Sequence, residues 1–219
     1  MRNLAVFKAI IFDLDGTLVD TLADLAGAMN WALGQLGEDT HSLDACRKMI
    51  GNGIVMFAKR ALAPEKQHLR SGLLELMKTR YGQHCFAKSS VYPGVNELIV
   101  KLGQMGIRLA VATNKEHDDA VKIVEHFFAQ GTFEIISGVR QNGPVKPDPA
   151  FAEAIMAKMA LASDDFVVIG DSDVDIATAK SAQMLSVGVT WGFRSREDLA
   201  AAGADIIIDK PEEIFDLLT

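Results

Sequence analysis

The amino-acid sequence predicts an α/β fold, in which a doubly wound, mostly parallel sheet carries an inserted all-helical domain. Short runs rich in Val, Ile and Ala show little polar alternation, which is typical of strands buried on both faces of a parallel sheet. Segments with apolar residues at helical spacing alternate with these runs, and Pro or Gly often separates the two. One long stretch, from about Val19 to Lys88, contains no convincing strand, so we expect a separate helical domain there.

The first predicted strand, residues 8–15, leads directly into this helical insert. Within the insert, apolar residues recur at close to helical spacing. Helices are expected there at residues 21–37, 53–62 and 64–82. We therefore expect a helical domain at residues 18–88, inserted into an α/β core formed by residues 1–17 and 89–219.

After the insert, strands and helices alternate to the end of the sequence. The remaining strands are expected at residues 107–114, 133–138, 166–172, 185–192 and 204–209. Helices are expected at residues 94–106, 117–128, 149–160, 173–184 and 195–203. In open α/β sheets ligands bind beyond the carboxyl ends of the strands, so the residues that follow each strand are the candidates for a site.

Composition and charge exclude several classes of protein. Lys and Arg number 22 against 29 Asp and Glu, a net charge of −7 without a basic block, which disfavours a nucleic-acid partner. No stretch approaches the roughly 18 consecutive apolar residues of a membrane helix. Cys46 and Cys85 are too few for a disulfide framework and lack zinc-site spacing. We expect a cytoplasmic protein that is a monomer or a homodimer.

Polar residues that could take part in catalysis or binding follow the predicted strands. These residues are Asp13, Asp15, Gly16 and Thr17 after the first strand, Thr113 and Asn114 after the second, Lys146 in the sequence VKPDP, and Asp171 and Asp175 after the strand at 166–172. Two unit charges 4 Å apart interact by about 4 kcal/mol at an effective dielectric constant of 20, so four carboxylates at one rim require a cation. Oxygen ligands together with a phosphate favour Mg²⁺, and Lys146 adds a further positive charge.

The spacing of the first two aspartates suits phosphoryl transfer. Residues i and i+2 of an extended strand point the same way, so Asp13 and Asp15 can face one small volume. One carboxylate can attack a phosphorus atom while the other protonates the leaving oxygen. Gly16 permits a tight turn that exposes backbone N–H groups. Thr17 and Thr113 offer hydroxyl donors to a phosphate, and Lys146 offers a point charge. The candidate phosphate-binding residues are Gly16, Thr17, Thr113, Asn114 and Lys146.

Several of these residues also have a simpler explanation. Lys146, which precedes Pro147, could be an ordinary exposed loop lysine. Asp-Gly is a common turn dipeptide, and Asp171 and Asp173 could cap the helix that follows, although Asp175 would then stay unexplained. The sequence DSDVD resembles the start of a calcium-binding EF-hand loop, but Ile176 and Ala182 stand where that loop needs Gly and Glu. The occurrence of all these residues in order at successive strand ends favours a site.

The stretches DLDGT, ATN, KPDP and GDSDVD together resemble the four motifs of the haloacid dehalogenase superfamily. The resemblance implies that Asp13 is a nucleophile, Asp15 a general acid and base, and Thr113 and Lys146 phosphate ligands. It implies a Mg²⁺ site made by Asp13, the backbone carbonyl of Asp15 and Asp171, with Asp175 in support. The helical insert resembles the all-helical cap of this superfamily.

Closer similarity is to phosphoglycolate phosphatases, through GNGIVMFAKRAL in the insert, YPGVNELIVKL, ATNK and WGFRSREDLAAAGADIIID. This similarity implies a phosphatase that converts 2-phosphoglycolate to glycolate and phosphate. One departure is Gln183, because the helix after the fourth motif commonly ends in Ala-Gly. The loop Gly51–Asn52–Gly53 either faces the leaving group of the substrate or is only a turn between helices.

Other functions stay open at this point. Asp15 favours phosphoryl transfer over dehalogenation, since the dehalogenases lack a carboxylate at this position and need no Mg²⁺. A sugar-phosphate mutase of the β-phosphoglucomutase type, a pyrophosphatase and a nucleotidase also fit. A signalling module that is phosphorylated on aspartate, such as a response-regulator receiver, is the alternative that is not an enzyme, but the long insert disfavours it.

Overall fold

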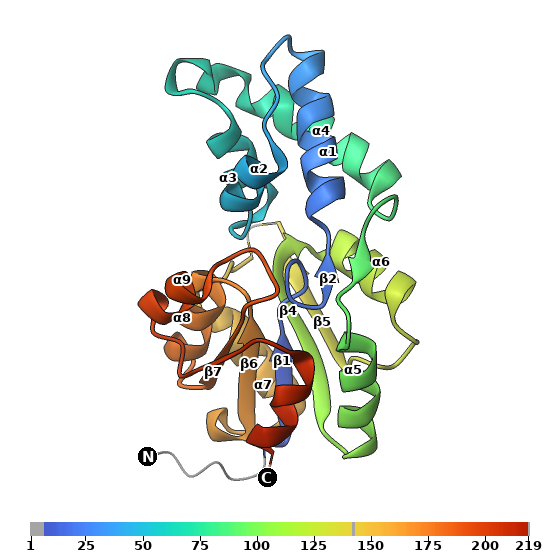
Figure 1. Cartoon of the computed structure of the whole chain (residues 1–219), viewed down its shortest axis with the longest axis vertical. Coiled ribbons are helices and arrows are strands. Elements are labelled where there is room, and N and C mark those ends of the chain that lie inside the picture. The colour runs from blue at the N-terminus through green and yellow to red at the C-terminus, as the bar shows by residue number, and fades with distance from the viewer. Residues whose placement is uncertain (1–6, 142, 219) are drawn as a thin grey trace. The chain divides into compact units, whose positions relative to one another are not determined.

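The computed structural model describes residues 7–141 and 143–218 (Figure 1). The chain divides into two compact units, one formed by Met1–Val19 with Val91–Thr219 and the other by Asp20–Ser90. The boundaries expected from the sequence lie two residues before each of these points. That the two units behave as separate domains stays a prediction.

The first unit contains a six-stranded sheet in which every pair of neighbours is parallel. Its order is β5-β4-β1-β6-β7-β8. The strands are β1 (Ala9–Phe12), β4 (Arg108–Glu116), β5 (Ile135–Val139), β6 (Phe166–Gly170), β7 (Leu185–Val189) and β8 (Ile206–Ile208). The α/β class, the parallel sheet and all six expected strands are therefore confirmed.

Strand β1 lies in the middle of the sheet, and all four of its residues are buried. Ala9 and Ile11 belong to an apolar cluster with residues of two helices, α7 (Pro149–Met159) and α8 (Asp173–Ser181). Because side chains alternate along a strand, Ile10 and Phe12 point to the other face, and both are about 1% exposed. The sheet is thus covered on both faces, as Figure 1 also shows.

The parallel register brings the polar strand ends together. Phe12 at the end of β1 pairs with Val111 of β4 and with Ile169 of β6. The polar residues that follow these three positions therefore meet at the same edge of the sheet. The other helices of this unit are α5 (Val95–Gln104), α6 (His117–Phe127) and α9 (Arg196–Ala202), with 3₁₀ helices at Ser163–Asp165 and Pro211–Leu217.

The second unit is helical, as expected. Its helices are α1 (Leu22–Gln35), α2 (Leu43–Met49), α3 (Gly53–Ala61) and α4 (Arg70–His84), with a 3₁₀ helix at Pro64–Leu69. Helices α1 and α4 pack together. Side chains that are at most 1% exposed are Met29, Ala32 and Leu33 of α1 and Leu73 and Met77 of α4. Helix α2 was not predicted, and the helix expected at residues 64–82 is wrong in its first turns, which form the 3₁₀ helix.

Two short strands, β2 (Val19–Asp20) and β3 (Ser90–Val91), pair where the chain enters and leaves the helical unit. The sequence does not predict these strands, because two residues are too few to carry a periodic signal. Within the helical unit, buried Asp24 accepts hydrogen bonds from the backbone N–H groups of Lys88 and Ser89 and from the hydroxyl of Ser89. Asp24 therefore ties the beginning of this unit to its end.

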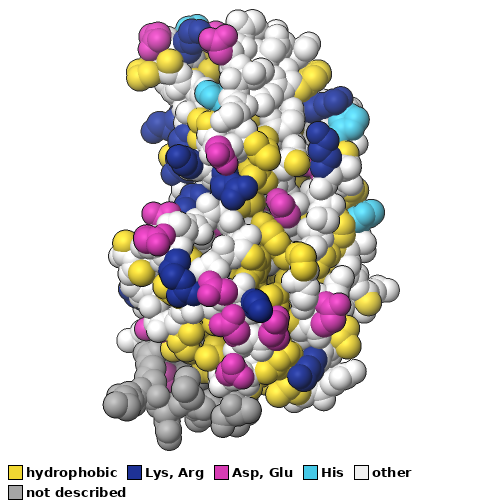
Figure 2. Space-filling model, viewed as in Figure 1, with side chains coloured by type: hydrophobic (Ala, Val, Ile, Leu, Met, Phe, Trp, Pro, Cys, Tyr) yellow, Lys and Arg dark blue, Asp and Glu magenta, His cyan; other side chains and the backbone are white. Residues whose placement is uncertain are grey.

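Acidic and basic side chains both occur over each unit on the face shown in Figure 2, which suits a chain with a moderate net charge. Within the described residues, no helix has the length and apolar character that crossing a membrane requires.

Candidate active site

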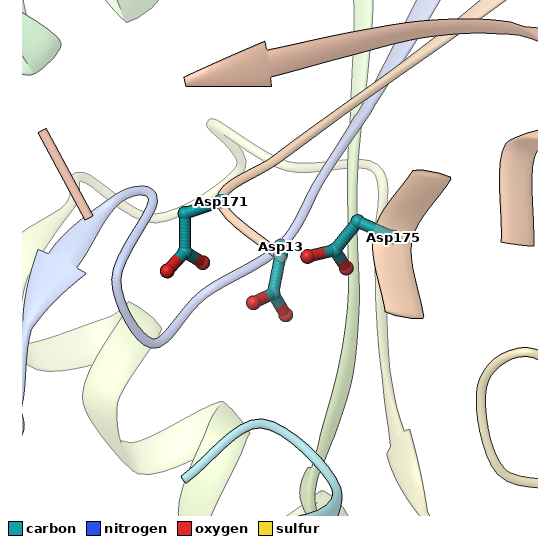
Figure 3. Close-up of side chains that lie close together, drawn as sticks. All are labelled: Asp13, Asp171 and Asp175. Carbon is teal, nitrogen blue, oxygen red and sulfur yellow. The ribbon is translucent and has the colours of Figure 1, made fainter. Parts of the chain in front are cut away.

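Three buried carboxylates lie together at the carboxyl edge of the sheet (Figure 3). Asp13 follows β1, Asp171 follows β6, and Asp175 lies in the first turn of α8. One carboxylate oxygen of each lies within 4.8 Å of the others. Asp13 is 8% exposed, and Asp171 and Asp175 are 1% exposed. Carboxylates so close and so buried require compensation by positive charge or by hydrogen bonds.

Lys146 supplies one positive charge to this cluster. Its Nζ atom donates to Asp13 Oδ1 at 2.8 Å, to Asp175 Oδ1 at 2.6 Å and to the carbonyl of Ala112 at 2.7 Å. Burial by itself would lower the pKa of Lys146, but the carboxylates of Asp13 and Asp175 raise it above its ordinary value. Lys146 is therefore charged, and the expectation that it lies beside the aspartates agrees with this geometry.

One lysine does not balance three carboxylates. Burial raises the pKa of Asp13 to about 7, with Asp175 and Asp15 adding to the rise and Lys146 opposing it. Burial also raises the pKa of Asp171 well above its ordinary value, and the charges of Asp13 and Asp175 act in the same direction. The cluster lacks positive charge, and its donors are carboxylate oxygens. These residues therefore fit a hard divalent cation such as Mg²⁺.

Hydrogen bonds and close packing orient Asp171. Its Oδ1 accepts from the hydroxyl of Thr17 at 3.2 Å, and its Oδ2 accepts from the backbone N–H of Phe193 at 2.7 Å. A Cβ atom at Gly16 would lie 2.4 Å from Asp171 Oδ2, and one at Gly192 would lie 2.3 Å from Asp171 Cβ. Both positions therefore need glycine, and Gly16 also has a φ of +92°, which favours glycine.

Asp175 is held by Ser172, the residue that caps α8. Its Oδ2 accepts from the backbone N–H of Ser172 at 3.1 Å and from the Ser172 hydroxyl at 2.6 Å. The alternative that Asp171 and Asp173 cap this helix is wrong, because Ser172 occupies the N-cap position. Asp171 precedes the helix, and Asp173 is exposed on its first turn. Asp175 can thus present its other oxygen to Lys146.

Three groups expected to contact phosphate have structural partners here. The backbone N–H of Gly16 donates to the carbonyl of Val19, and the Thr17 hydroxyl is engaged by Asp171. The side-chain amide of Asn114 makes two hydrogen bonds with the backbone of Lys146. Asn114 Oδ1 accepts from the Lys146 N–H at 2.8 Å, and Asn114 Nδ2 donates to the Lys146 carbonyl at 3.2 Å. These residues position Asp171 and Lys146 in this conformation, and their contact with a phosphate stays a prediction.

Thr113 and Asp15 both contact Lys115, a residue for which the sequence predicts no role. The backbone N–H of Lys115 donates to the Thr113 hydroxyl at 3.2 Å. Its ammonium group lies 2.9 Å from both carboxylate oxygens of Asp15. The side chains of Lys115 and Asp15 are 6% and 14% exposed. The available signal was the position of Lys115 in the sequence ATNK, two residues after Thr113.

The segment Gly51–Asn52–Gly53 connects α2 to α3 of the helical unit, and Gly53 is the first residue of α3. Gly51 and Gly53 have φ angles of +123° and +79°, which favour glycine. Arg60 of α3 donates to the carbonyl of Met49 at 2.7 Å and to Asn52 Oδ1 at 2.6 Å, so it fastens the loop to its own helix. The geometry accounts for the two glycines as a helix–helix turn, and a contact with substrate stays a prediction.

Comparison with known proteins relates the chain to a single family. Residues 10–189 match the family described as haloacid dehalogenase-like hydrolase. The chain is 32% identical to the phosphoglycolate phosphatase of Pseudomonas syringae pv. tomato over 92% of this chain and 76% of that protein. It is 32% identical to the phosphoglycolate phosphatase of Vibrio parahaemolyticus over 96% of each. The crystal structure of a predicted phosphoglycolate phosphatase from Haemophilus somnus superposes with a TM-score of 0.90 at 30% identity, covering 100% of both chains.

Proposed function

The chain belongs to the haloacid dehalogenase-like hydrolases and is a phosphatase, and from this premise we propose that it hydrolyses 2-phosphoglycolate in a Mg²⁺-dependent reaction. The observation that carries the proposal is the buried cluster of Asp13, Asp171 and Asp175 around Lys146. The curated relatives named phosphoglycolate phosphatase support the choice of substrate.

Asp13 is the nucleophile in this proposal. Its Oδ1 accepts from Lys146, while its Oδ2 accepts no hydrogen bond from the part of the chain that the structure describes. Asp171 and Asp175, in contrast, have both carboxylate oxygens engaged. Asp13 therefore has an oxygen available for in-line attack on phosphorus, which yields an aspartyl-phosphate and releases the alcohol.

Asp15 is the general acid and base. It protonates the leaving alkoxide oxygen in the first step and takes a proton from the water that hydrolyses the aspartyl-phosphate in the second. Its side chain is 14% exposed, close to the 11% of Asp13, and it lies two residues beyond Asp13 at the same edge of the sheet. Lys146 and the Thr113 hydroxyl stabilise negative charge on the phosphoryl oxygens, because phosphoryl transfer depends on positioning and charge stabilisation.

Asp13, Asp171 and the backbone carbonyl of Asp15 would hold Mg²⁺, with Asp175 supporting the site. When bound, Mg²⁺ would supply positive charge to the phosphoryl oxygens and would relieve the repulsion among the carboxylates. We expect EDTA to abolish turnover and added Mg²⁺ to restore it. Activity that chelation leaves unchanged would contradict this assignment.

A panel of substrates tests the proposed function. Phosphate release is measured with Mg²⁺ from 2-phosphoglycolate, a sugar phosphate, a nucleotide and pyrophosphate, and the values of kcat/KM are compared. We expect steady turnover with the highest kcat/KM for 2-phosphoglycolate. A preference for pyrophosphate or a nucleotide would contradict the proposed substrate. Isomerisation of the sugar phosphate would indicate a mutase, and one long-lived aspartyl-phosphate without turnover would indicate a signalling module.

The Asp15→Asn variant tests the assignment of Asp15 as the general acid and base, separate from the nucleophile Asp13. We expect it to lose nearly all turnover, because Asn cannot donate or accept the proton. Turnover close to that of the wild type would contradict the assignment of Asp15. The role of the helical unit as a cap that closes over the substrate, the cytoplasmic location and the monomeric or homodimeric state stay predictions.

A further inference from the structure

We propose that Lys115 recognises a carboxylate on the leaving group, so that the enzyme selects phosphate esters of 2-hydroxy acids over esters of neutral alcohols. This inference rests on the proposed function, because it takes Asp15 as the residue beside the leaving oxygen. It adds the residue that sets specificity and the substrate class that this residue selects.

The position of Lys115 follows from the strand that carries it. Strands β1 and β4 are parallel, with Phe12 opposite Val111, so Asp13 and Asp15 lie beyond β1 in the same direction as Thr113 and Lys115 along β4. Thr113 is the proposed phosphoryl ligand. Lys115 lies two residues farther along β4, and its ammonium group lies 2.9 Å from both carboxylate oxygens of Asp15. Lys115 therefore lies on the leaving-group side of the phosphoryl site.

The contact with Asp15 shows what the Lys115 ammonium can bind. Both oxygens of the Asp15 carboxylate lie 2.9 Å from Nζ, so the lysine already holds one carboxylate through two equal contacts. Among the described residues, Lys115 and Lys146 are the only lysines that are buried, and Lys146 is committed to Asp13 and Asp175. Lys115 is therefore the buried lysine that lies beside Asp15.

A purely structural role explains the pair less well. Burying two charges costs free energy that their attraction often does not recover, so a buried ion pair is a weak source of stability. In 2-phosphoglycolate one carbon atom separates the ester oxygen from the carboxylate. A substrate whose ester oxygen lies beside Asp15 therefore brings its carboxylate next to Lys115. We infer that the substrate carboxylate replaces that of Asp15 on the ammonium group, which leaves Asp15 to turn toward the ester oxygen.

Two substrates test this inference in the wild-type enzyme. The values of kcat/KM with Mg²⁺ are compared for 2-phosphoglycolate and for its carboxamide. The amide group of the carboxamide has nearly the same shape as the carboxylate but carries no charge. We expect the carboxylate to be preferred by about 10²-fold, the effect of a lost hydrogen bond between charged groups. Equal values would overturn the inference while leaving the phosphatase function intact. Turnover of neither substrate and of no other phosphate ester would refute the proposed function itself.

The Lys115→Met variant then assigns the preference to this residue. We expect it to lose about 10²-fold more in kcat/KM for the carboxylate than for the carboxamide, chiefly through KM. An equal loss for both substrates, seen in kcat, would overturn the inference and would make Lys115 a positioning residue for Asp15. Lys115→Arg should keep part of the preference for the carboxylate over the carboxamide, because it keeps the positive charge. This variant replaces Lys115→Met in the test if the Met variant fails to fold. Lys122→Met, an exposed lysine on α6, is the matched control and should keep the wild-type preference.

Discussion

The carboxylate of Asp13 is expected to lower the stability of the metal-free protein, so its replacement by Asn should stabilise the fold. Burial raises the pKa of Asp13 to about 7, against 3.8 in an unfolded chain. The folded protein therefore binds a proton at this position more tightly than the unfolded chain does. The free energy of unfolding falls as the pH rises from about 4 to about 7, and it stays low above that range.

The size of the effect follows from the two pKa values. A difference of roughly 3 pKa units corresponds to about 4 kcal/mol when Asp13 is ionised in both states, as it is near pH 8. Near pH 5 the folded protein still keeps the proton, and the cost is less than half as large. Asn resembles the neutral carboxyl group in shape and can still accept from Lys146. Asp13→Asn should thus gain up to about 4 kcal/mol at pH 8 and about 2 kcal/mol or less at pH 5.

Urea unfolding in EDTA, followed by circular dichroism and by fluorescence, measures this difference for the wild type and for Asp13→Asn at both pH values. Asp164→Asn is the control, because it removes the same charge from an exposed position. A variant that is less stable than the wild type at pH 8 would refute the reasoning. A gain that is the same at pH 5 and pH 8 would also refute it, because the effect would then not come from ionisation.

Two further substitutions test the geometry. Gln183 has a φ of +59° just after α8, a backbone conformation that favours glycine. Gln183→Gly should therefore raise the free energy of unfolding by about 0.5–1 kcal/mol without changing kcat. An unchanged or lower melting temperature would contradict this prediction. Lys146→Met removes the one lysine that contacts Asp13 and Asp175, so the metal-free protein should lose about 3–5 kcal/mol at pH 8. That loss should be smaller at pH 5, where the carboxyl groups can take up protons, and an equal loss in urea unfolding at both pH values would speak against the charge argument.

The sequence was enough to predict the sheet because each central strand is a short apolar run that both faces of the sheet bury. Helix α2 was not predicted, because it lacks the apolar pattern of an amphipathic helix. Only Cys46 among its seven residues is buried, so it has no periodic apolar face. The strands β2 and β3 have two residues each, and their pairing depends on two segments about 70 residues apart. Elements that depend on distant partners leave little local signal.

The same limit applies to the site. Asp13, Asp171 and Lys146 could be placed together because parallel strands end at one edge. The groups that orient these side chains could not be predicted from the sequence. The backbone N–H of Phe193 that binds Asp171 and the close approach of Gly192 come from the stretch WGFR, whose similarity to phosphoglycolate phosphatases implied no contact with Asp171. Groups expected to bind phosphate, such as the Thr17 hydroxyl, proved to hold a neighbouring carboxylate.

Phosphate release from 2-phosphoglycolate by the Asp13→Asn variant tests the central claim most directly. With Mg²⁺ present, the wild type should turn over steadily, and the variant should be at least about 10³-fold slower in kcat, as is typical when a covalent nucleophile is removed. The variant should stay folded, since its metal-free form is expected to be the more stable one. A folded Asp13→Asn protein with kcat within about tenfold of the wild type would contradict the assignment of Asp13 as the nucleophile.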